Sequence, residues 1–422
     1  MRLILGVKTA GFSIFFLFWS PNGIFAGGYA IPHQTAKAVS LSNAVTAGVN
    51  DPSAVYVNPA ALTEVDGNQV LGGITYINTV SSVSNSGRRS VNKHDDSFLP
   101  TFFANYHIPK TDLTFGIGLY SPFGLATTYA EDDFTRFGAV RSELKTIYVT
   151  NAMAWRVNPY LSFGGGLSFI HSSALFSRAI FLGAAGEGRI RLTGTDNGFT
   201  FNLGVLFKPH KDVKIGLTYR GGEILNFDTA KAKIADFTGA VTTVKSKGTQ
   251  LPLPPVISLG INWQPTPAWA LEFVYDYTRW SEFPHLKARF DQSVLLAPGL
   301  PFSGLFIQEL WKNTSTLRLG SSYQLDDVFE LRAGIAVDET PIPGNTLGPS
   351  IPGADILTLN GGFGYAWKGF TLDVGYMAVF YKNRRVLNNV LEADTPLNPF
   401  TPGRDKYETF NNFVALNIQY RF

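Results

Sequence analysis

The sequence contains no cysteine and only three methionines among its 422 residues. The absence of cysteine excludes disulfides, thiolate metal ligands and cysteine nucleophiles. Charged residues make up only 16% of the chain, the net charge is +3, and no run of Lys or Arg marks a surface for nucleic acid. Beyond the N-terminus we find no apolar run of about 20 residues, the length that a membrane-spanning helix needs. These absences disfavour nucleic-acid binding and a helical membrane protein.

Glycine and aromatic residues are abundant instead, with 42 Gly, 34 Phe and 17 Tyr. This composition is typical of many strands joined by turns. Residues 1–26 differ from the rest, because Arg2 and Lys8 precede an apolar stretch that ends at Pro21 and is followed by a small residue at Ala26. We interpret them as a signal peptide cleaved near Ala26.

Most of the remaining chain alternates between apolar and polar residues with a period of two, as half-buried strands do. The last strand has the clearest alternation, with one apolar face formed by Val414, Leu416, Ile418, Tyr420 and Phe422. Similar alternation occurs near residues 213–220, 269–278, 329–338 and 370–380. The strands of a soluble β-sandwich would show the same alternation of apolar and polar residues. The lengths of the connections between strands must therefore distinguish the two folds.

The connections alternate between short and long. Six short turns lie at residues 109–112, 158–160, 208–211, 264–267, 324–327 and 367–369. Seven long connections lie near residues 84–97, 121–142, 178–194, 229–250, 291–310, 339–354 and 386–408. Together they predict fourteen strands, and short periplasmic turns with long outer loops are the outer-membrane pattern.

Aromatic residues flank the short turns, among them Trp155, Trp263, Trp367, Phe370 and Tyr420. Amphipathic rings at one level of successive hairpins indicate an interfacial girdle. A sheet can sit in lipid only when it is closed, because an open edge leaves backbone groups unpaired. We therefore predict an all-β fold, a transmembrane antiparallel β-barrel of about 14 strands formed by residues 67–422.

Residues 27–66 do not alternate in this way. The stretch 35–46 is compatible with a short helix, and Pro59 restricts Asn58 to an extended conformation. A barrel of about fourteen strands has interior space that its own side chains do not fill. We expect a small, partly helical plug in the lumen, although a periplasmic tail is an alternative.

The sequence resembles the FadL/TodX family of outer-membrane long-chain fatty acid and hydrocarbon transporters. The hatch motif of that family matches Asn58, Pro59 and Ala60, together with Asp51, Ser53 and Leu62. Residues 120–129 resemble the kinked third strand, and later blocks match at 217–220, 280–281, 311–312 and 334–343. The resemblance covers essentially the whole mature chain.

The resemblance implies sites on this chain. A lateral opening would lie at the kink, at Pro122, Phe123 and Gly124, where Pro cannot donate a ladder hydrogen bond and Gly marks a bend; an ordinary strand end is the alternative. Basic residues for a fatty acid headgroup would be Arg178 and Lys312, unless both are solvated loop residues. Apolar residues of an outer ligand-collecting groove would include Phe181, Leu182, Phe302 and Phe306, with Leu296, Leu300 and Leu305 nearby.

The implied function is passive uptake of a hydrophobic small molecule, a long-chain fatty acid in the first place, into outer-membrane lipid of a Gram-negative cell. Aromatic or alkane hydrocarbons are the alternative ligands in the same fold, and a general diffusion porin is the alternative class. We expect a monomer without cofactor or metal.

Catalytic signatures are missing from the sequence. There is no Gly-x-Ser-x-Gly elbow, and none of the six His forms a His-x-x-x-His pair. The glycines at 164–166 and 361–364 lie within strands, which favours close packing or bends over phosphate loops. We expect no enzyme, with an outer-membrane lipase as the remaining catalytic alternative.

Overall fold

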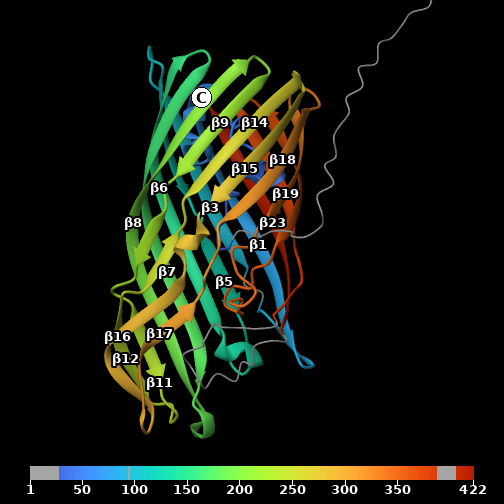
Figure 1. The fold of residues 1–422 in the computed structure, drawn as a ribbon. Coiled ribbons are helices and arrows are strands. Elements are labelled where there is room, and N and C mark those ends of the chain that lie inside the picture. Colours follow the sequence, from blue (N-terminus) through green and yellow to red (C-terminus); the bar gives the residue numbers. More distant parts are fainter. Residues whose placement is uncertain (1–27, 94–95, 387–404) are drawn as a thin grey trace, which may run out of the picture.

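A computed structural model describes residues 28–93, 96–386 and 405–422. Within these ranges, fourteen antiparallel strands close into one barrel (Figure 1), as the sequence predicted. The barrel closes where β1 pairs with β23, from Gln69 opposite Arg421 to Ser84 opposite Lys406. The strands of the barrel wall are β1 (Gln69–Asn85), β3 (Ser97–His107), β4 (Leu113–Tyr120), which β5 (Gly124–Thr128) continues, β6 (Arg141–Asn158), β7 (Leu161–Phe181), β8 (Glu187–His210), β9 (Val213–Arg220), β14 (Val256–Thr266), β15 (Trp269–Thr278), β18 (Thr314–Gln324), β19 (Phe329–Asp338), β20 (Ile356–Trp367), β21 (Phe370–Tyr381) and β23 (Lys406–Arg421).

The alternation along each strand sorts side chains between lipid and lumen. On β23, Leu416 and Ile418 point outward and are exposed, whereas Ala415 and Asn417 are buried against the interior. The same division recurs on other strands, so the outer face is a band of large apolar side chains. Such a face is stable only in contact with lipid, because water would be ordered around it. No helix in the described ranges is long and apolar enough to span a membrane.

All six predicted short turns join consecutive wall strands at one end of the barrel. The C-terminus lies at this end as well, where the backbone N–H of Arg421 donates to the carbonyl of Gly369 in the turn between β20 and β21 (2.9 Å). Exposed aromatic side chains gather beside these turns, among them Trp155, Tyr160, Trp263, Trp367 and Phe422. This end therefore has the short turns and the aromatic girdle that the sequence predicts for the periplasmic end.

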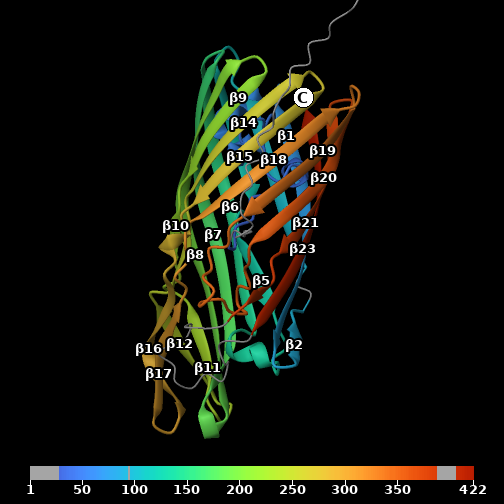
Figure 2. The same cartoon turned by 45° about the vertical axis from the view of Figure 1, so that its right-hand side comes forward.

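The opposite, outer end carries additional structure. The long strand β8 pairs there with β11 (Lys231–Ala235), and the sheet continues through β12 (Val241–Lys247) and β16 (His285–Ala297) to β17 (Leu300–Gln308) (Figure 2). β10 (Glu223–Asn226) and β13 (Gln250–Leu253) form a separate pair. The remaining outer elements are β2 (Arg88–Val91), η2 (Phe134–Phe137), η3 (Gly183–Ala185), η4 (Trp280–Glu282) and β22 (Arg384–Arg385). Most of the predicted connection at 386–408 lies outside the described residues.

The N-terminal segment from residue 28 to residue 66 fills the lumen, as predicted for a plug. It contains α1 (Ala36–Ser40), α2 (Ala54–Val57) and η1 (Pro59–Glu64), and nearly all of its residues are buried. α1 packs against β20 and β21, while η1 packs against β6 and β7 in another part of the wall. We call this segment the hatch. The predicted signal peptide lies outside the described residues, so its cleavage site stays a prediction.

The helix in the hatch is shorter than the stretch 35–46 allows. Thr35 caps it by accepting a hydrogen bond from the backbone N–H of Ala38 (3.1 Å). It ends at Ser40 because Ser42 and Asn43 take positive φ angles of 53° and 61°, which turn the chain back. The predicted extended conformation of Asn58 is confirmed, with φ −154° and ψ 100° directly after α2.

Inward-facing glycines of the wall let the hatch backbone approach closely. A Cβ atom at Gly334 would lie 2.5 Å from the carbonyl carbon of Leu41 and 2.7 Å from the nitrogen of Ser42. Gly164 is equally close to Pro59 and Ala60, and Gly375 is equally close to Ala36. The predicted role of the strand glycines in close packing is thus confirmed for Gly164.

We expect Gly334→Ala to weaken the folded state by about 1–3 kcal/mol, because the added methyl group overpacks against hatch backbone that cannot rotate away. Gly361→Ala is the matched control, since the nearest atom to its Cβ would be 3.9 Å away. Urea denaturation in detergent micelles measures both. Equal midpoints for the two variants would contradict the seating of the hatch on Gly334.

Candidate functional site

A cavity lies between the hatch and the wall at the level of the third-strand kink. The volume of this cavity is about 70 Å³, which is enough for more than a single water molecule. The hatch contributes Ala30, Pro32 and Tyr56 to its lining. The wall and the outer connections contribute Tyr120, Pro122, Phe123, Tyr148, Ser168, Thr200, Phe201, Asn202, Arg220, Gly221, Pro254, Val256, Asp276, Thr278, Trp280, Thr316, Arg318 and Asp338.

The third strand is interrupted at the predicted kink. β4 ends with Tyr120 opposite Tyr148, and β5 resumes with Gly124 opposite Lys145. Three residues on one strand therefore face two on its neighbour, which is the arrangement of a β-bulge. Pro122 sits in the bulge and has no N–H to donate to the ladder.

On the side that faces β3, the kink leaves a gap in strand pairing. β3 pairs with β4 only from Phe102 onward, and its residues Ser97 to Thr101 pair with β1 alone among the described residues. β5 likewise pairs only with β6 in the described ranges. The wall is therefore not hydrogen-bonded between the outer half of β3 and β5. This gap lies at the predicted Pro122, Phe123 and Gly124.

The first described residues of the hatch lie along the gap from inside. The N–H of Ile31 donates to the carbonyl of Pro122 (2.7 Å), and the N–H of Gly124 donates to the carbonyl of Tyr29 (3.0 Å). Ala30 and Phe123 thus form an isolated antiparallel bridge. The Gln34 amide bonds both the N–H and the carbonyl of Ser121. Residues 28–34, which we call the latch, satisfy backbone groups that β3 leaves unpaired.

Aromatic rings enclose Tyr29 in the latch. Ring centroids lie 4.8 Å away for Trp280, 5.5 Å for Trp311 and 6.3 Å for Phe283. These three residues flank the hairpin of β16 and β17, so the outer hairpin and the latch share one packed cluster. Gly28 leaves no room for a side chain, because a Cβ there would lie 2.7 Å from the ring of Trp311. We call Trp280, Phe283 and Trp311 the clamp.

Glu309 lies buried at the base of the clamp, in the connection between β17 and β18. Its carboxylate accepts a hydrogen bond from the indole N–H of Trp311 (2.8 Å). Burial raises the pKa of this carboxyl to about 8, and the bond from Trp311 opposes the shift only in part. The carboxyl is therefore protonated in the folded protein over much of the range in which an exposed Glu is charged.

The hatch residues predicted as a motif have clear structural roles. The Asn58 amide donates to the carbonyls of Thr46 (2.9 Å) and Val205 (3.3 Å), and its oxygen accepts from the N–H of Ala60 (3.2 Å). Asn58 thus connects two parts of the hatch to β8. Pro59 begins η1, and Ala60 fits against Gly164 because it is small.

Charged side chains of the wall fix the opposite side of the hatch by hydrogen bonds to its backbone. Arg318 pairs with Asp276 (2.8 Å) and donates to the carbonyl of Ser42 (3.0 Å). The backbone N–H of Ala47 donates to the carboxylate of Glu272 (2.6 Å). Groups held this tightly in the interior are costly to separate, because each would be left buried without its partner. The body of the hatch is thus anchored by charged groups, whereas the latch is held by ring contacts and by uncharged hydrogen bonds, including those of Gln34 to Ser121 and of the Tyr29 hydroxyl to the carbonyl of Pro252.

The two predicted headgroup residues lie outside the cavity. Arg178 is near the outer end of β7, opposite Ile190 of β8, and the side chain of Lys312 is exposed. Neither belongs to the cavity lining. Their role in ligand binding stays a prediction.

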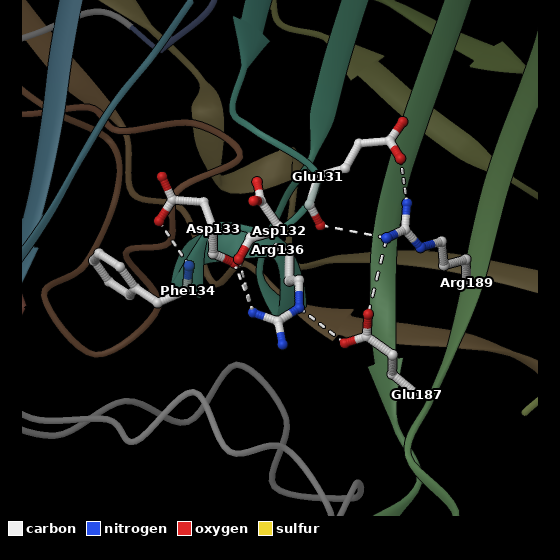
Figure 3. A network of polar contacts seen from close by, with 7 residues as sticks. All are labelled: Glu131, Asp132, Asp133, Phe134, Arg136, Glu187 and Arg189. Atoms are coloured by element: carbon white, nitrogen blue, oxygen red, sulfur yellow. Dashed lines mark hydrogen bonds and ion pairs between the residues drawn. The ribbon is translucent and has the colours of Figure 1, made fainter.

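The predicted groove residues are spread over the outer region. Phe181 packs on Phe137 (5.9 Å), beside a network in which Glu187 pairs with Arg136 (2.8 Å) and Arg189 (Figure 3). Leu182 is buried, and Phe302 packs on Phe290 (5.5 Å). Phe306 is exposed beside the ring of His285. None of the four lines the cavity.

Sequence reasoning missed Tyr29 and the contacts of the clamp and of Arg220. Trp280, Trp311 and Arg220 stand in blocks that carried the family resemblance, so their positions were noticed but their contacts were not. In the part of the chain that the structure describes, no group of three or more His, Cys, Asp or Glu side chains is placed to hold a metal ion.

We expect the stability of the clamp to depend on pH. The folded-state pKa of Glu309 lies above its ordinary value of 4.5, so its contribution is complete below about pH 4.5 and is lost as the pH rises through 8. The thermal midpoint, followed by tryptophan fluorescence in detergent, should fall between pH 5 and pH 9. Glu309→Gln should flatten this slope, and Glu282→Gln, at an exposed position, should not. An unchanged slope in Glu309→Gln would contradict the assignment.

This chain is similar to known proteins over most of its length. The long-chain fatty acid transport protein of Escherichia coli K12 is 28% identical over 376 residues, which cover 77% of this chain and 81% of that protein. A FadL homologue of Pseudomonas aeruginosa has the same fold, with a TM-score of 0.80 at 20% identity over 94% of this chain and 100% of that one. The toluene transporter TodX of Pseudomonas putida has a TM-score of 0.73 at 16% identity over 92% and 98%.

A family model also matches nearly the whole sequence. It is described as outer membrane protein transport protein (OMPP1/FadL/TodX) and covers residues 21–422. The match includes the hatch, the kinked strand and the entire wall, and the family consists of transporters rather than enzymes. The chain belongs to the OMPP1/FadL/TodX family of outer membrane transport proteins.

Proposed function

We propose that the protein takes up long-chain fatty acids passively across the outer membrane of a Gram-negative cell. The ligand leaves the cavity sideways, through the gap in strand pairing between β3 and β5. The observation that carries this proposal is the latch, a segment of seven residues at the gap whose removal would join the cavity to the lipid.

The physical reason for a lateral route is the solubility of the ligand. A long alkyl chain gains free energy by leaving water for an apolar surface, about 0.8 kcal/mol for each buried CH₂ group. A water-filled pore would not provide that gain along the way. A path from an aromatic cavity to the bilayer keeps the chain out of water throughout.

The hatch is the second support. It occupies the lumen and is bound to the wall by Arg318 through the carbonyl of Ser42, by Glu272 through the N–H of Ala47, and by Asn58 through the carbonyl of Val205. Passage straight through the lumen would have to break these buried contacts. Opening the gap requires only the latch to leave. We propose that residues 27–66 form the hatch domain and residues 67–422 form the wall.

The fatty acid is proposed because the relative from Escherichia coli is named as a long-chain fatty acid transport protein and because the cavity contains basic side chains. Aromatic hydrocarbons are the second candidate, favoured by the many rings in the cavity lining and by the fold shared with the toluene transporter of Pseudomonas putida. In the outer region, Arg178 and Lys312 with Phe181, Leu182, Phe302 and Phe306 remain proposed ligand contacts. We propose that the mature protein, cleaved near Ala26, acts as a monomer.

Two measurements test this function. In planar bilayers we expect the intact protein to conduct little current, because the hatch fills the lumen; a large steady current would indicate a diffusion porin. In cells that depend on the protein for uptake, we expect radiolabelled oleate to enter faster than in cells with an empty vector. Uptake of toluene without uptake of oleate would replace the fatty acid by a hydrocarbon as the ligand.

A further inference from the structure

The cavity contains one basic side chain that is free of acidic partners. Its lining includes four charged residues: Arg220, Asp276, Arg318 and Asp338. Asp276 is paired with Arg318 (2.8 Å), and Asp338 accepts a hydrogen bond from Thr316 (2.6 Å). Arg220 forms no ion pair with any carboxylate in the described part of the chain. Its charge is therefore available to a ligand.

The position of Arg220 is fixed by the wall. It is the last residue of β9, and its backbone is opposite Asn202 of β8 on one side and Val256 of β14 on the other. Its guanidinium carbon lies 4.9 Å from the ring centroid of Tyr56 in the hatch. A cation held over an aromatic face keeps its orientation while its N–H groups stay free to donate.

A line of rings connects Arg220 to the latch. Tyr56 contacts Tyr120 (4.8 Å between centroids), and Tyr120 contacts Tyr148 (5.7 Å). Tyr148 in turn contacts Phe123 (6.4 Å), which forms the bridge with the latch. The cavity thus presents a cation at one end of a continuous aromatic wall and the gap at the other.

We propose that Arg220 is the residue that binds the carboxylate of the ligand, so that the cavity selects anionic amphiphiles over neutral hydrocarbons. This inference rests on the proposed uptake of a hydrophobic ligand. The alkyl chain lies along Tyr120, Tyr148 and Phe123, with its end at the latch. A guanidinium donates two parallel hydrogen bonds to a carboxylate, which a neutral ligand does not accept in the same way.

The other basic residues suit this role less well. Arg318 is only 5% exposed and already donates to Asp276 and to the carbonyl of Ser42. Lys312 is exposed outside the cavity lining, and its charge is screened by water. Arg178 also lies outside the lining, near the outer end of β7.

The test compares an acid with its uncharged ester. Binding of oleate and of methyl oleate to the purified full-length protein is measured for wild type, Arg220→Met, Arg220→Lys and Lys312→Met. Lys110→Met, at an exposed position outside the cavity lining, is the control. We expect Arg220→Met to weaken oleate binding about 10- to 100-fold, the usual effect of losing a charged hydrogen bond, and to leave methyl oleate unchanged. Arg220→Lys should keep part of the preference, and Lys110→Met should keep all of it.

The other outcomes contradict the inference, and each of them has a different meaning. Equal oleate binding by wild type and Arg220→Met overturns the role of Arg220 while leaving uptake in place. Loss of both ligands in Arg220→Met and in Arg220→Lys assigns the residue a structural role, and the thermal midpoint shows whether the fold has changed. Loss of the oleate preference in Lys312→Met alone would assign the headgroup to that residue. Binding of neither ligand by wild type contradicts the proposed function itself.

Discussion

The structure depends on one constraint: every backbone N–H and C=O group of a wall in lipid must find a hydrogen-bond partner inside the protein. Fourteen strands meet this constraint almost everywhere by pairing with their neighbours. At the third strand they do not, because Pro122 and the bulge around it separate β5 from β3. The latch supplies partners from the lumen for the backbone groups of Ser121, Pro122 and Gly124. A wall with a closable opening therefore needs a plug beside it.

The same constraint explains the composition of the wall and the hatch. Polar side chains and inward glycines on the wall accept the irregular backbone of the hatch at close range, as Gly334 does for Leu41 and Glu272 does for Ala47. Buried charged side chains of the wall, Arg318 and Glu272, hold the body of the hatch on one side by hydrogen bonds to its backbone. The latch has no ion pair of its own among the described residues and depends on the clamp for its packing. Anchoring and release are thus divided between two parts of one short segment.

Much of this fold could be predicted from the sequence. The period of two at Val414 to Phe422, the alternation of short and long connections and the aromatic residues at the short turns determine a closed wall without any knowledge of contacts. Pro122 and Gly124 also indicated where pairing fails, because proline and glycine act on the backbone locally. Asn58 and Pro59 marked the hatch for the same reason.

The site was less predictable, because its contacts join distant segments. The ring of Tyr29 meets Trp280 and Trp311 only after the outer connections fold back over the lumen. Arg220 is one of 35 basic residues, and what distinguishes it is a place in the cavity lining without an ion pair among the described residues, which no spacing in the sequence reveals. The outer sheet of β11, β12, β16 and β17 likewise depends on pairing between segments that are far apart in the chain.

The most direct test of the account is to lock the latch onto the wall. Ala30 and Phe123 form a bridge of the type without mutual hydrogen bonds, in which Cα atoms are about 4.5 Å apart and a disulfide fits. The chain has no other cysteine, so Ala30→Cys with Phe123→Cys gives one defined bond. We predict that oleate uptake stops when this bond is oxidised, returns on reduction, and persists under both conditions in each single variant. Undiminished uptake by the fully oxidised double variant would contradict exit through the wall.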